Sequence, residues 1–580
     1  MAERPVGSTA VPERRGRRRS RADARRSRVT FWLFPLGTYL LFAVALFHRA
    51  LLSDHSAIGY GSDPYLFQWH LAWISHALST GHNPLFSRYV ATPNGGENLM
   101  YYTSLPLAGL LLWPVTALGG ALLSYNLLMV LCVVLSGLTS FIMCTRFVEW
   151  RPAALVGGLV YAFSPYMAAQ SFGHPHLTMA WFPPAVVIAA DCIVRSDRSA
   201  ASLGVRFGLL VTAQLLLGTE VLVTSVLLSA LGVTIWLAWC RRDPVLAKVW
   251  KRGVTALAVA SVTVVVAGCF PLYMLLFGHP RVGVKAPIQP TGVFLNDLAG
   301  FVVPGRVQLL SWRGSRSYTQ RFSGNFVEAT AYVGLPVLIV VGFFLWKRRS
   351  ERTVRLSVIA AGICGLLSLG PRLHLGGKII AASLRLPAAI LSRIPVLWNI
   401  LPSRLMLYGY LALGLALAAA VDRGSVHGRR SRLILVCLAL AFAIPVSTPS
   451  LHEVTPATFR SVARRGGVAL VTPGSSSEQQ MYWQADTGFS VRLVGGLTFS
   501  ARPPNPLLDT LALGDSSGRW HQPTSQEVQV LRASARSLGA TVVLDVPDQH
   551  EGGRRSFLAA VFGQPAVGAD GLAVWRVVRP

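Results

Sequence analysis

Charged residues are scarce in this chain of 580 residues. Only 14% of the residues are charged, 52% are hydrophobic, and the mean hydropathy is +0.47. Because soluble domains carry about 25% charged residues, this composition excludes a chain built only from soluble domains. A membrane is the solvent that such a chain requires.

Signals of several other protein classes are also missing. The seven cysteines all lie in or beside apolar segments, so we expect neither a disulfide framework nor a zinc site. The chain has no Asn-x-Ser/Thr sequon, and its frequent Arg, Ala and Gly are typical of a bacterial plasma membrane protein.

About eleven apolar segments are long enough to cross a membrane. A helix needs roughly 20 mostly apolar residues to cross about 30 Å of hydrocarbon. The predicted spans are residues 31–52, 124–145, 152–170, 178–194, 203–218, 221–240, 253–277, 329–346, 356–370, 402–421 and 433–448. We therefore predict an α-helical polytopic membrane protein.

The net charge of +29 comes from basic residues whose positions indicate a topology. Ten arginines precede the first span, and the other basic clusters follow the even-numbered spans. These clusters are Arg146 and Arg151; Arg195 and Arg198; Arg241, Arg242, Lys248, Lys251 and Arg252; Lys347, Arg348, Arg349 and Arg352; and Arg423, Arg429 and Arg430. Because cytoplasmic loops carry an excess of Lys and Arg, we expect a cytoplasmic N-terminus. Nucleic-acid binding is a poor explanation of charge placed in this way.

This orientation divides the chain into three parts. We expect a basic cytoplasmic tail at 1–30, a transmembrane domain at 31–448 and an extracytoplasmic domain at 449–580. Large outer loops are expected at 53–123, 278–328 and 371–401. Residues 104–123 are apolar but interrupted by Pro106 and Pro114. As a full span they would invert the topology that follows, so we predict a re-entrant or interfacial segment.

The C-terminal part has a different pattern from the rest. Its runs GVALVTPG, TVVLDVPD and GLAVWRVVR alternate apolar residues between Gly, Pro and Asp, with helix-like stretches between them. This pattern is typical of a small α/β domain. The domain lacks a nucleotide-binding glycine loop and a nucleophile motif, which favours binding or a structural role over catalysis.

Ionisable residues are almost absent from the middle of the predicted spans. Pumps and coupled transporters usually carry such groups at mid-depth. The ionisable groups gather instead at the predicted outer face: Asp54, Asp63, Glu97, His174, His176, Glu220, Arg281, Lys285, Glu328 and Arg404. This distribution favours a site at the membrane–water boundary, where a lipid-linked substrate presents its headgroup.

The local sequence GSDPYLF allows two interpretations of Asp63. Pro64 is favoured at the first helical position, so Asp63 is a good N-cap. A carboxylate held by a rigid turn at the interface is equally suited to act as a general base, and the two roles are compatible. Trp69 and Trp73 lie one helical turn apart, and we expect interfacial anchors there rather than sugar-stacking platforms.

Several strings along the chain resemble one family. After the first span come GSDPYLF, TSLPLAGLLLWP, SYNLL and GGLVYAFSPYMAAQSFGHPHL, followed by NFVEATAYVGLPVL, SLGPRLHLGG and IPVLWNILPSRLMLYG. In this order they resemble the GT-C superfamily of membrane glycosyltransferases, and most closely its YfhO-type branch. The resemblance covers most of residues 31–421.

The resemblance implies an enzyme that transfers a sugar from a polyprenyl-phosphate carrier to a hydroxyl outside the membrane. The family's catalytic base matches Asp63. A second acidic or polar position commonly follows the third span, where this chain has His174 and His176. This departure puts a metal–carboxylate pair in doubt. A divalent metal remains one reading of the two histidines, and polar filling of an interface is the other.

A lipid phosphate as leaving group requires cations on the outer face. Arg404 is our first choice as its ligand, because a planar guanidinium suits bidentate contact. Arg281 is a further candidate. Residues 371–404 also carry Arg372, Lys378, Arg385 and Arg393 without any Asp or Glu, in an amphipathic run equally suited to lipid headgroups. Glu220 and Glu328 are candidates for substrate binding, with a helix-terminus role as the alternative for Glu220.

The sequence thus predicts a GT-C-like membrane glycosyltransferase with a small extracytoplasmic α/β domain. Its expected partners are a polyprenyl-phosphate-linked sugar, an envelope glycan, lipid or protein acceptor, and membrane lipids. Its expected location is the plasma membrane. The alternative is a lipid or polysaccharide translocator, or a non-catalytic envelope assembly protein with the same fold.

Overall fold

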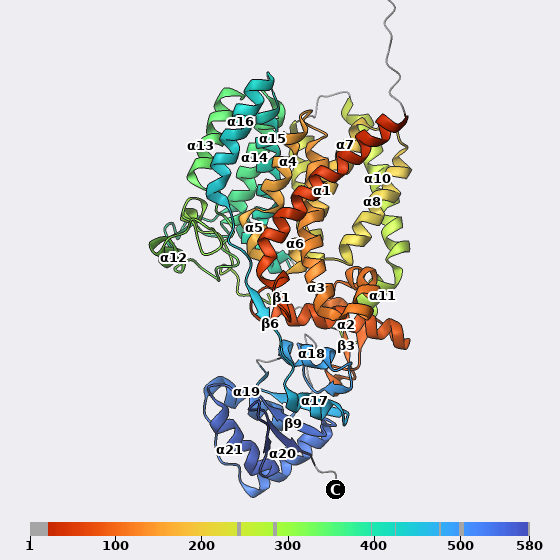
Figure 1. Cartoon of the computed structure of the whole chain (residues 1–580), viewed down its shortest axis with the longest axis vertical. Coiled ribbons are helices and arrows are strands. Elements are labelled where there is room, and N and C mark those ends of the chain that lie inside the picture. Colours follow the sequence, from red (N-terminus) through yellow and green to blue (C-terminus); the bar gives the residue numbers. More distant parts are fainter. Residues whose placement is uncertain are drawn as a thin grey trace, which may run out of the picture.

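A computed structural model describes residues 21–239, 245–281, 287–395, 397–423, 425–474, 477–497 and 504–577. Most of the predicted basic tail, Lys285, Arg241 and Arg242 lie outside the described residues. The first part of the chain is a helix bundle, and the last part is a separate α/β unit at one end of it (Figure 1).

Each predicted span falls on a helix or a pair of helices. The bundle consists of α1 (Arg21–Leu51), α3 (Pro106–Cys144), α4 (Arg151–Ala162), α5 (Pro165–Gln170), α6 (Pro175–Thr178), α7 (Phe182–Arg195), α8 (Ala200–Leu215), α9 (Thr219–Trp239), α10 (Val245–Ala267), α11 (Cys269–Phe277), α13 (Leu335–Lys347), α14 (Arg352–Ser368), α15 (Met406–Asp422) and α16 (Val426–Leu440). The prediction of a polytopic helical membrane protein is confirmed, because six of the described helical segments are long and apolar enough to cross a membrane. The number of eleven crossings stays a prediction.

The apolar stretch at 104–123 is continuous with the span after it. Residues 106–119 form the first part of α3, and Gly120 then breaks the helical geometry with φ 82° and ψ 169°. The first part packs against α2 (Asp63–Thr80), since a Cβ on Gly109 would meet Ile74. The break at Gly120 allows residues 106–119 to run in a different direction from the rest of α3, as an interfacial segment requires.

The loops after α11 and α14 form a lateral lobe, which we define as the described residues of 287–334 and 371–401. It contains the short elements η3 (Leu298–Phe301), α12 (Arg313–Thr319), β4 (His374–Leu375), β5 (Lys378–Ile379), η4 (Pro387–Arg393) and η5 (Leu397–Asn399), and it is followed by η6 (Pro402–Leu405). Asp297 joins the two loops, because its carboxylate accepts backbone N–H bonds from Ala299, Gly376 and Gly377. The lobe projects from the side of the bundle (Figure 1).

The C-terminal part is built on a five-stranded sheet of order β10-β11-β9-β7-β8. The strands are β7 (Gly467–Thr472), β8 (Val491–Leu493), β9 (Val542–Asp545), β10 (Ala566–Val567) and β11 (Ala573–Arg576). The β8, β7 and β9 strands are parallel, and β11 and β10 are antiparallel additions. The helices are α17 (Ala457–Ala463), α18 (Ser477–Asp486), α19 (Pro506–Ser517), α20 (Ser525–Ser537) and α21 (Glu551–Phe562).

The C-terminal unit is attached to the first long loop of the bundle. β1 (Ser56–Ile58) pairs antiparallel with β6 (Ser450–His452), and α2 packs against α18. The remaining elements of this loop are β2 (Phe86–Ser87), η1 (Thr92–Asn94), β3 (Glu97–Asn98) and η2 (Leu99–Tyr101). One hydrophobic cluster contains side chains from both parts. This apolar contact fixes the C-terminal unit on the loop that contains Asp63.

The prediction that Trp69 and Trp73 are interfacial anchors is not supported by their positions. Both side chains are buried, and the indole N–H of Trp69 donates to Gln484 Oε1 of α18 at 2.8 Å. The two indoles stack with ring centroids 5.9 Å apart. They are part of the hydrophobic cluster between α2 and the C-terminal unit. A buried indole usually needs a hydrogen-bond partner for its N–H, and for Trp69 the side-chain amide of Gln484 is that partner.

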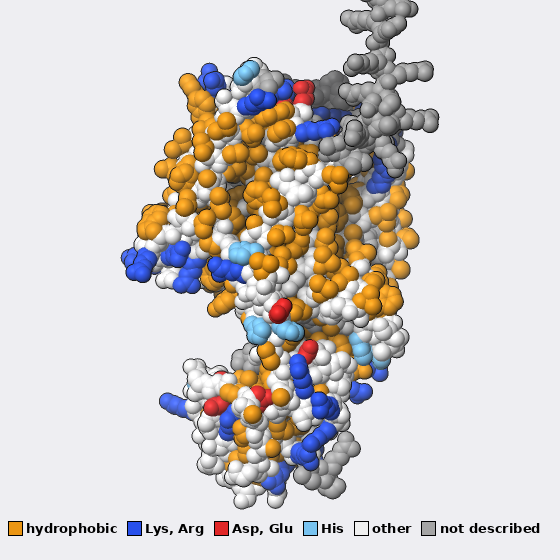
Figure 2. Space-filling view, in the orientation of Figure 1, with side chains coloured by type: hydrophobic (Ala, Val, Ile, Leu, Met, Phe, Trp, Pro, Cys, Tyr) orange, Lys and Arg blue, Asp and Glu red, His pale blue; other side chains and the backbone are white. Residues whose placement is uncertain are grey.

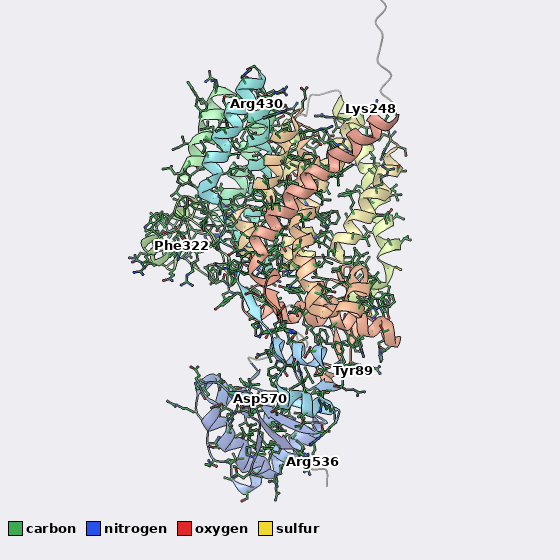
Figure 3. All side chains as sticks on the ribbon, viewed as in Figure 1. Tyr89, Lys248, Phe322, Arg430, Arg536 and Asp570 are labelled. Atoms are coloured by element: carbon green, nitrogen blue, oxygen red, sulfur yellow. The ribbon has the colours of Figure 1, made fainter. Side chains whose placement is uncertain are left out.

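Charge and hydropathy are distributed unevenly along the long axis. Hydrophobic side chains cover the visible face of the bundle, and Lys and Arg lie at its upper end (Figure 2). Arg430 and Lys248 are at this end, whereas Arg536 and Asp570 are in the C-terminal unit at the opposite end (Figure 3).

Candidate functional site

Asp63 begins α2, at the end of the bundle that faces the C-terminal unit. The helix starts one residue earlier than predicted, so that Ser62 is the N-cap and Asp63 lies in the first turn. The capping interpretation of Asp63 is therefore wrong, because Ser62 occupies the N-cap position. Nε2 of His174 donates to Oδ2 of Asp63 at 2.7 Å. The side chain of Asp63 is 44% exposed, so the carboxylate remains accessible from solvent.

Two glycines allow the loops that carry Asp63 and His174 to approach each other. Gly59 has φ 135°, and a Cβ there would lie 2.9 Å from the Phe172 carbonyl oxygen. Gly173 has φ 144°, and a Cβ there would lie 3.0 Å from Pro64 Cδ. Backbone of this kind favours glycine strongly. These two positions bring the Asp63 turn against the turn before His174.

His176 lies deeper than His174 and is buried among bundle residues. Its ring stacks on Phe67 of α2 with centroids 5.3 Å apart, and it meets the His174 ring edge-on at 5.9 Å. Its carbonyl oxygen approaches Gly218 so closely that a Cβ there would lie 2.6 Å away. The histidine pair thus connects α2 to the turn that precedes Glu220.

Arg404 lies between two carboxylates. Its NH1 donates to Glu220 Oε2 at 2.5 Å, and its Nε and NH2 donate to Glu328 Oε1 at 3.0 and 2.6 Å. Ser403 Oγ donates to the other oxygen of Glu328 at 2.9 Å. The Glu328 side chain is 4% exposed and that of Arg404 is 15% exposed. We name these three charged residues, Glu220, Glu328 and Arg404, the carboxylate–arginine cluster.

The charges within the cluster partly cancel. Burial would raise the pKa of Glu328, but the positive charge and hydrogen bonds of Arg404 outweigh it and hold that pKa below its usual value. With two carboxylates against one guanidinium, the cluster carries a net negative charge when both are ionised. A lipid phosphate would therefore have to displace a carboxylate from Arg404. The geometry gives little support to Arg404 as the first phosphate ligand.

The Asp63–His174 pair and the carboxylate–arginine cluster are close neighbours. His174 interacts electrostatically with Glu220 and Glu328, and His176 does so with Arg404. The chain around them is also in contact, because the Phe172 and Phe326 rings lie 5.6 Å apart. Six of the seven predicted site residues thus share one region of the structure.

Arg281 is the seventh predicted site residue, and it lies apart from this region. Its side chain is exposed just beyond α11, and within the described ranges no ion pair or hydrogen bond joins it to the others. Its assignment to the site stays a prediction.

The site residues do not fit a metal centre. Within the described part of the chain, no three His, Cys, Asp or Glu side chains are grouped so that they could hold a metal ion. Asp63 Oδ2 and His174 Nε2 contact each other directly at 2.7 Å. We therefore derive no chemistry from a metal at this position.

Sequence reasoning missed a buried glutamate beneath α2. Glu453 Oε1 accepts a 2.5 Å hydrogen bond from Gln68 Nε2, and Gln68 is one turn beyond Pro64. Burial raises the pKa of Glu453 to about 8, against the hydrogen bond from Gln68. The two residues are 385 positions apart, and no local pattern indicates their contact.

Several solved structures are similar to this chain. The arabinofuranosyltransferase AftD from Mycobacteria matches with a TM-score of 0.54 and 15% identity, over 96% of this chain and 40% of that one. This chain thus spans less than half the length of AftD. The archaeal oligosaccharyltransferase AglB from Archaeoglobus fulgidus matches with a TM-score of 0.42 and 12% identity, over 89% of this chain and 69% of that one. ArnT from Cupriavidus metallidurans matches with a TM-score of 0.43 and 15% identity, over 95% and 98%.

The AftD similarity establishes the fold and not the activity, because the identity is low. It shows a fold shared with AftD and does not address the YfhO-type branch. No curated protein matches the chain. A family model described as "Domain of unknown function (DUF6311)" matches residues 36–444, which is more than half of the chain, and the chain therefore belongs to this family.

Proposed function

We propose that this protein is a membrane glycosyltransferase of GT-C type. It moves a sugar from a polyprenyl-phosphate donor to a cell-envelope acceptor at the extracytoplasmic face. The observation that carries this proposal is the accessible Asp63 carboxylate, oriented by His174 at 2.7 Å beside the carboxylate–arginine cluster. The fold shared with AftD, which is named as an arabinofuranosyltransferase, supports the same reaction class.

Asp63 acts as the general base in this reaction. Its carboxylate accepts the proton of an acceptor hydroxyl while that oxygen forms a bond to the anomeric carbon of the donor sugar. The bond from the anomeric carbon to the phosphate oxygen breaks, and the lipid phosphate leaves with the electron pair. His174 donates to Asp63 Oδ2 and so holds the carboxylate in one orientation.

The carboxylate–arginine cluster positions the sugar in this proposal. Glu220 Oε1 is buried and has no hydrogen-bond partner among the described residues, so it is available to a sugar hydroxyl. Arg404 holds Glu220 and Glu328 in place. The phosphate instead meets exposed cations, of which Arg372, Lys378, Arg385 and Arg393 in the lateral lobe have no acidic partner within the described ranges.

Transfer by purified full-length protein tests the proposal. Radiolabelled polyprenyl-phosphate pentoses and hexoses are offered with envelope acceptors to the wild type, to Asp63→Asn and to Asp54→Asn. Asp54 is an exposed carboxylate of the same loop and serves as the matched control. Since a general base contributes about 100- to 10,000-fold, we expect Asp63→Asn to lose at least 100-fold in rate and Asp54→Asn to keep the wild-type rate.

Two outcomes would contradict the proposal. Equal transfer by Asp63→Asn and wild type would remove Asp63 from the mechanism. Absence of transfer by the wild type, together with loss of lipid-linked glycan export when the protein is deleted, would support a translocator instead.

A further inference from the structure

A cavity of about 170 Å³ lies within the lateral lobe, next to the carboxylate–arginine cluster. Its wall includes Ala329 and Ala331, which flank Thr330 two residues beyond Glu328. A cavity of about 150 Å³ is large enough to admit a ring such as benzene. The space in the lobe therefore accommodates one six-membered ring.

Side-chain amides supply unused hydrogen-bonding groups at this cavity. Gln308 is 2% exposed, its Oε1 accepts from the Gly305 N–H at 2.7 Å, and its Nε2 has no partner among the described residues. Asn325 accepts from the Glu328 N–H through Oδ1, and both Asn325 and Gln320 are exposed residues of the cavity lining. A buried N–H without a partner is costly, so Gln308 indicates a ligand that accepts a hydrogen bond.

Aromatic rings form the apolar part of the wall. Phe322, Phe326 and Tyr332 line the cavity, and Phe322 is marked on the lobe in Figure 3. The negative face of an aromatic ring attracts the partly positive C–H groups of a sugar ring. Amides combined with aromatic faces match the alternation of hydroxyl and C–H groups on a saccharide.

The charges at the cavity compensate for one another. Asp297 already accepts three backbone N–H bonds, and the guanidinium of Arg306 lies 5.8 Å from the centre of the Phe326 ring. One anionic and one cationic side chain leave the wall without a net charge. A phosphate or a carboxylate-bearing sugar would find little compensation here, so a neutral ligand is favoured.

We infer that this cavity binds one neutral monosaccharide unit of the acceptor glycan. The inference rests on the proposed function, because transfer requires an acceptor. Phe326 connects the cavity to the site, since its ring packs on Phe172, whose carbonyl accepts the N–H of Tyr60 next to the Asp63 turn. A glycan with one ring in the cavity extends along this contact toward Asp63.

Binding to full-length protein in detergent tests the inference without any transfer. The probe is an array of neutral and anionic mono- and disaccharides in pyranose and furanose forms, and the tightest neutral member is then titrated. We expect Gln308→Leu to weaken binding about tenfold, as loss of one or two hydrogen bonds predicts. Gln320→Leu changes an exposed residue of the lining and tests the same cavity without risk to the core. Gln529→Leu, an exposed amide in α20, is the control and should bind as the wild type does.

The Asp63→Asn variant separates this inference from the proposed function. It should bind the saccharide as the wild type does while it fails in transfer. Failure of any neutral saccharide to bind, or equal binding by the wild type, Gln308→Leu and Gln320→Leu, would overturn the inference. So would selective binding of anionic saccharides that these variants weaken.

Discussion

Arg404 holds two carboxylates that the fold places beside the candidate base. Removing it by Arg404→Leu leaves Glu220 and Glu328 facing each other without a cation. Because breaking a buried pair leaves an uncompensated charge, we expect a loss of about 3–5 kcal/mol in the free energy of unfolding. Glu328→Gln should cost less, since Arg404 keeps one carboxylate. Thermal unfolding in detergent measures both, and Arg385→Leu, an exposed arginine of the lobe, is the control. Equal unfolding temperatures of Arg404→Leu and this control would contradict a structural role for the cluster.

Glu453 makes stability depend on pH. Burial raises its pKa to about 8 in the folded protein, with Gln68 as hydrogen-bond donor. A group whose folded pKa is raised contributes stability that is full below its unfolded pKa, about 4.3, and is lost as pH rises through the folded value. We therefore expect the unfolding temperature to fall between pH 5 and pH 8. Glu453→Gln, which can still accept from Gln68, should flatten that fall, whereas Glu478→Gln should not. The same slope in all three proteins would exclude Glu453 as its cause.

At the scale of elements, the approach of the loop before α2 to the turn before α6 depends on glycine. Gly59→Ala adds a Cβ 2.9 Å from both the Phe172 oxygen and Pro64 Cγ, whereas Gly61→Ala adds one with no heavy atom within 4 Å. Both residues have positive φ, so backbone strain of about 1–3 kcal/mol is common to both variants. We expect transfer to fall at least tenfold more in Gly59→Ala, because the collision separates Asp63 from His174. A rate assay on the two variants checks this, and equal rates would contradict it.

Some helix ends are set by local sequence signals that a hydropathy profile does not detect. The predicted span at 152–170 is two helices, because Ser164 caps α5 and Pro165 begins it. The residue before a proline is driven out of the helical region, and Ser164 has ψ 157°. The predicted span at 253–277 is likewise divided, with Gly268 between α10 and α11. Both signals, Ser164 before Pro165 and the glycine at 268, are present in the sequence.

At the scale of the whole molecule, the basic end of the bundle and the C-terminal unit lie at opposite ends (Figure 3). In a cysteine-free background, Arg430→Cys and Arg536→Cys place single exposed thiols at these two ends. We expect a membrane-impermeant maleimide to label Arg536→Cys in intact cells and Arg430→Cys only after lysis, because clustered Lys and Arg favour the cytoplasm. Labelling of both thiols in intact cells would overturn the orientation that places Asp63 outside.

The sequence by itself determined where the apolar helices lie and which polar residues gather at one end of them. Hydropathy is a local property, so a window of about 20 residues reads it without knowledge of contacts. The likeness of short strings to GT-C enzymes pointed to Asp63 and His174, and the ionisable groups at the ends of the apolar segments pointed to Glu220 and Arg404. The structure places these four residues in one region.

Only the tertiary structure decided which side chains those residues contact. Arg404 is held by Glu220 and Glu328, from positions 184 and 76 residues away. Trp69 is buried against Gln484 instead of facing a membrane interface. Pairings between distant segments depend on how whole helices and the C-terminal unit pack together, and neither composition nor periodicity encodes that packing locally. A sequence shows which charged residues a site contains, but only the fold shows which residues of opposite charge pair with them.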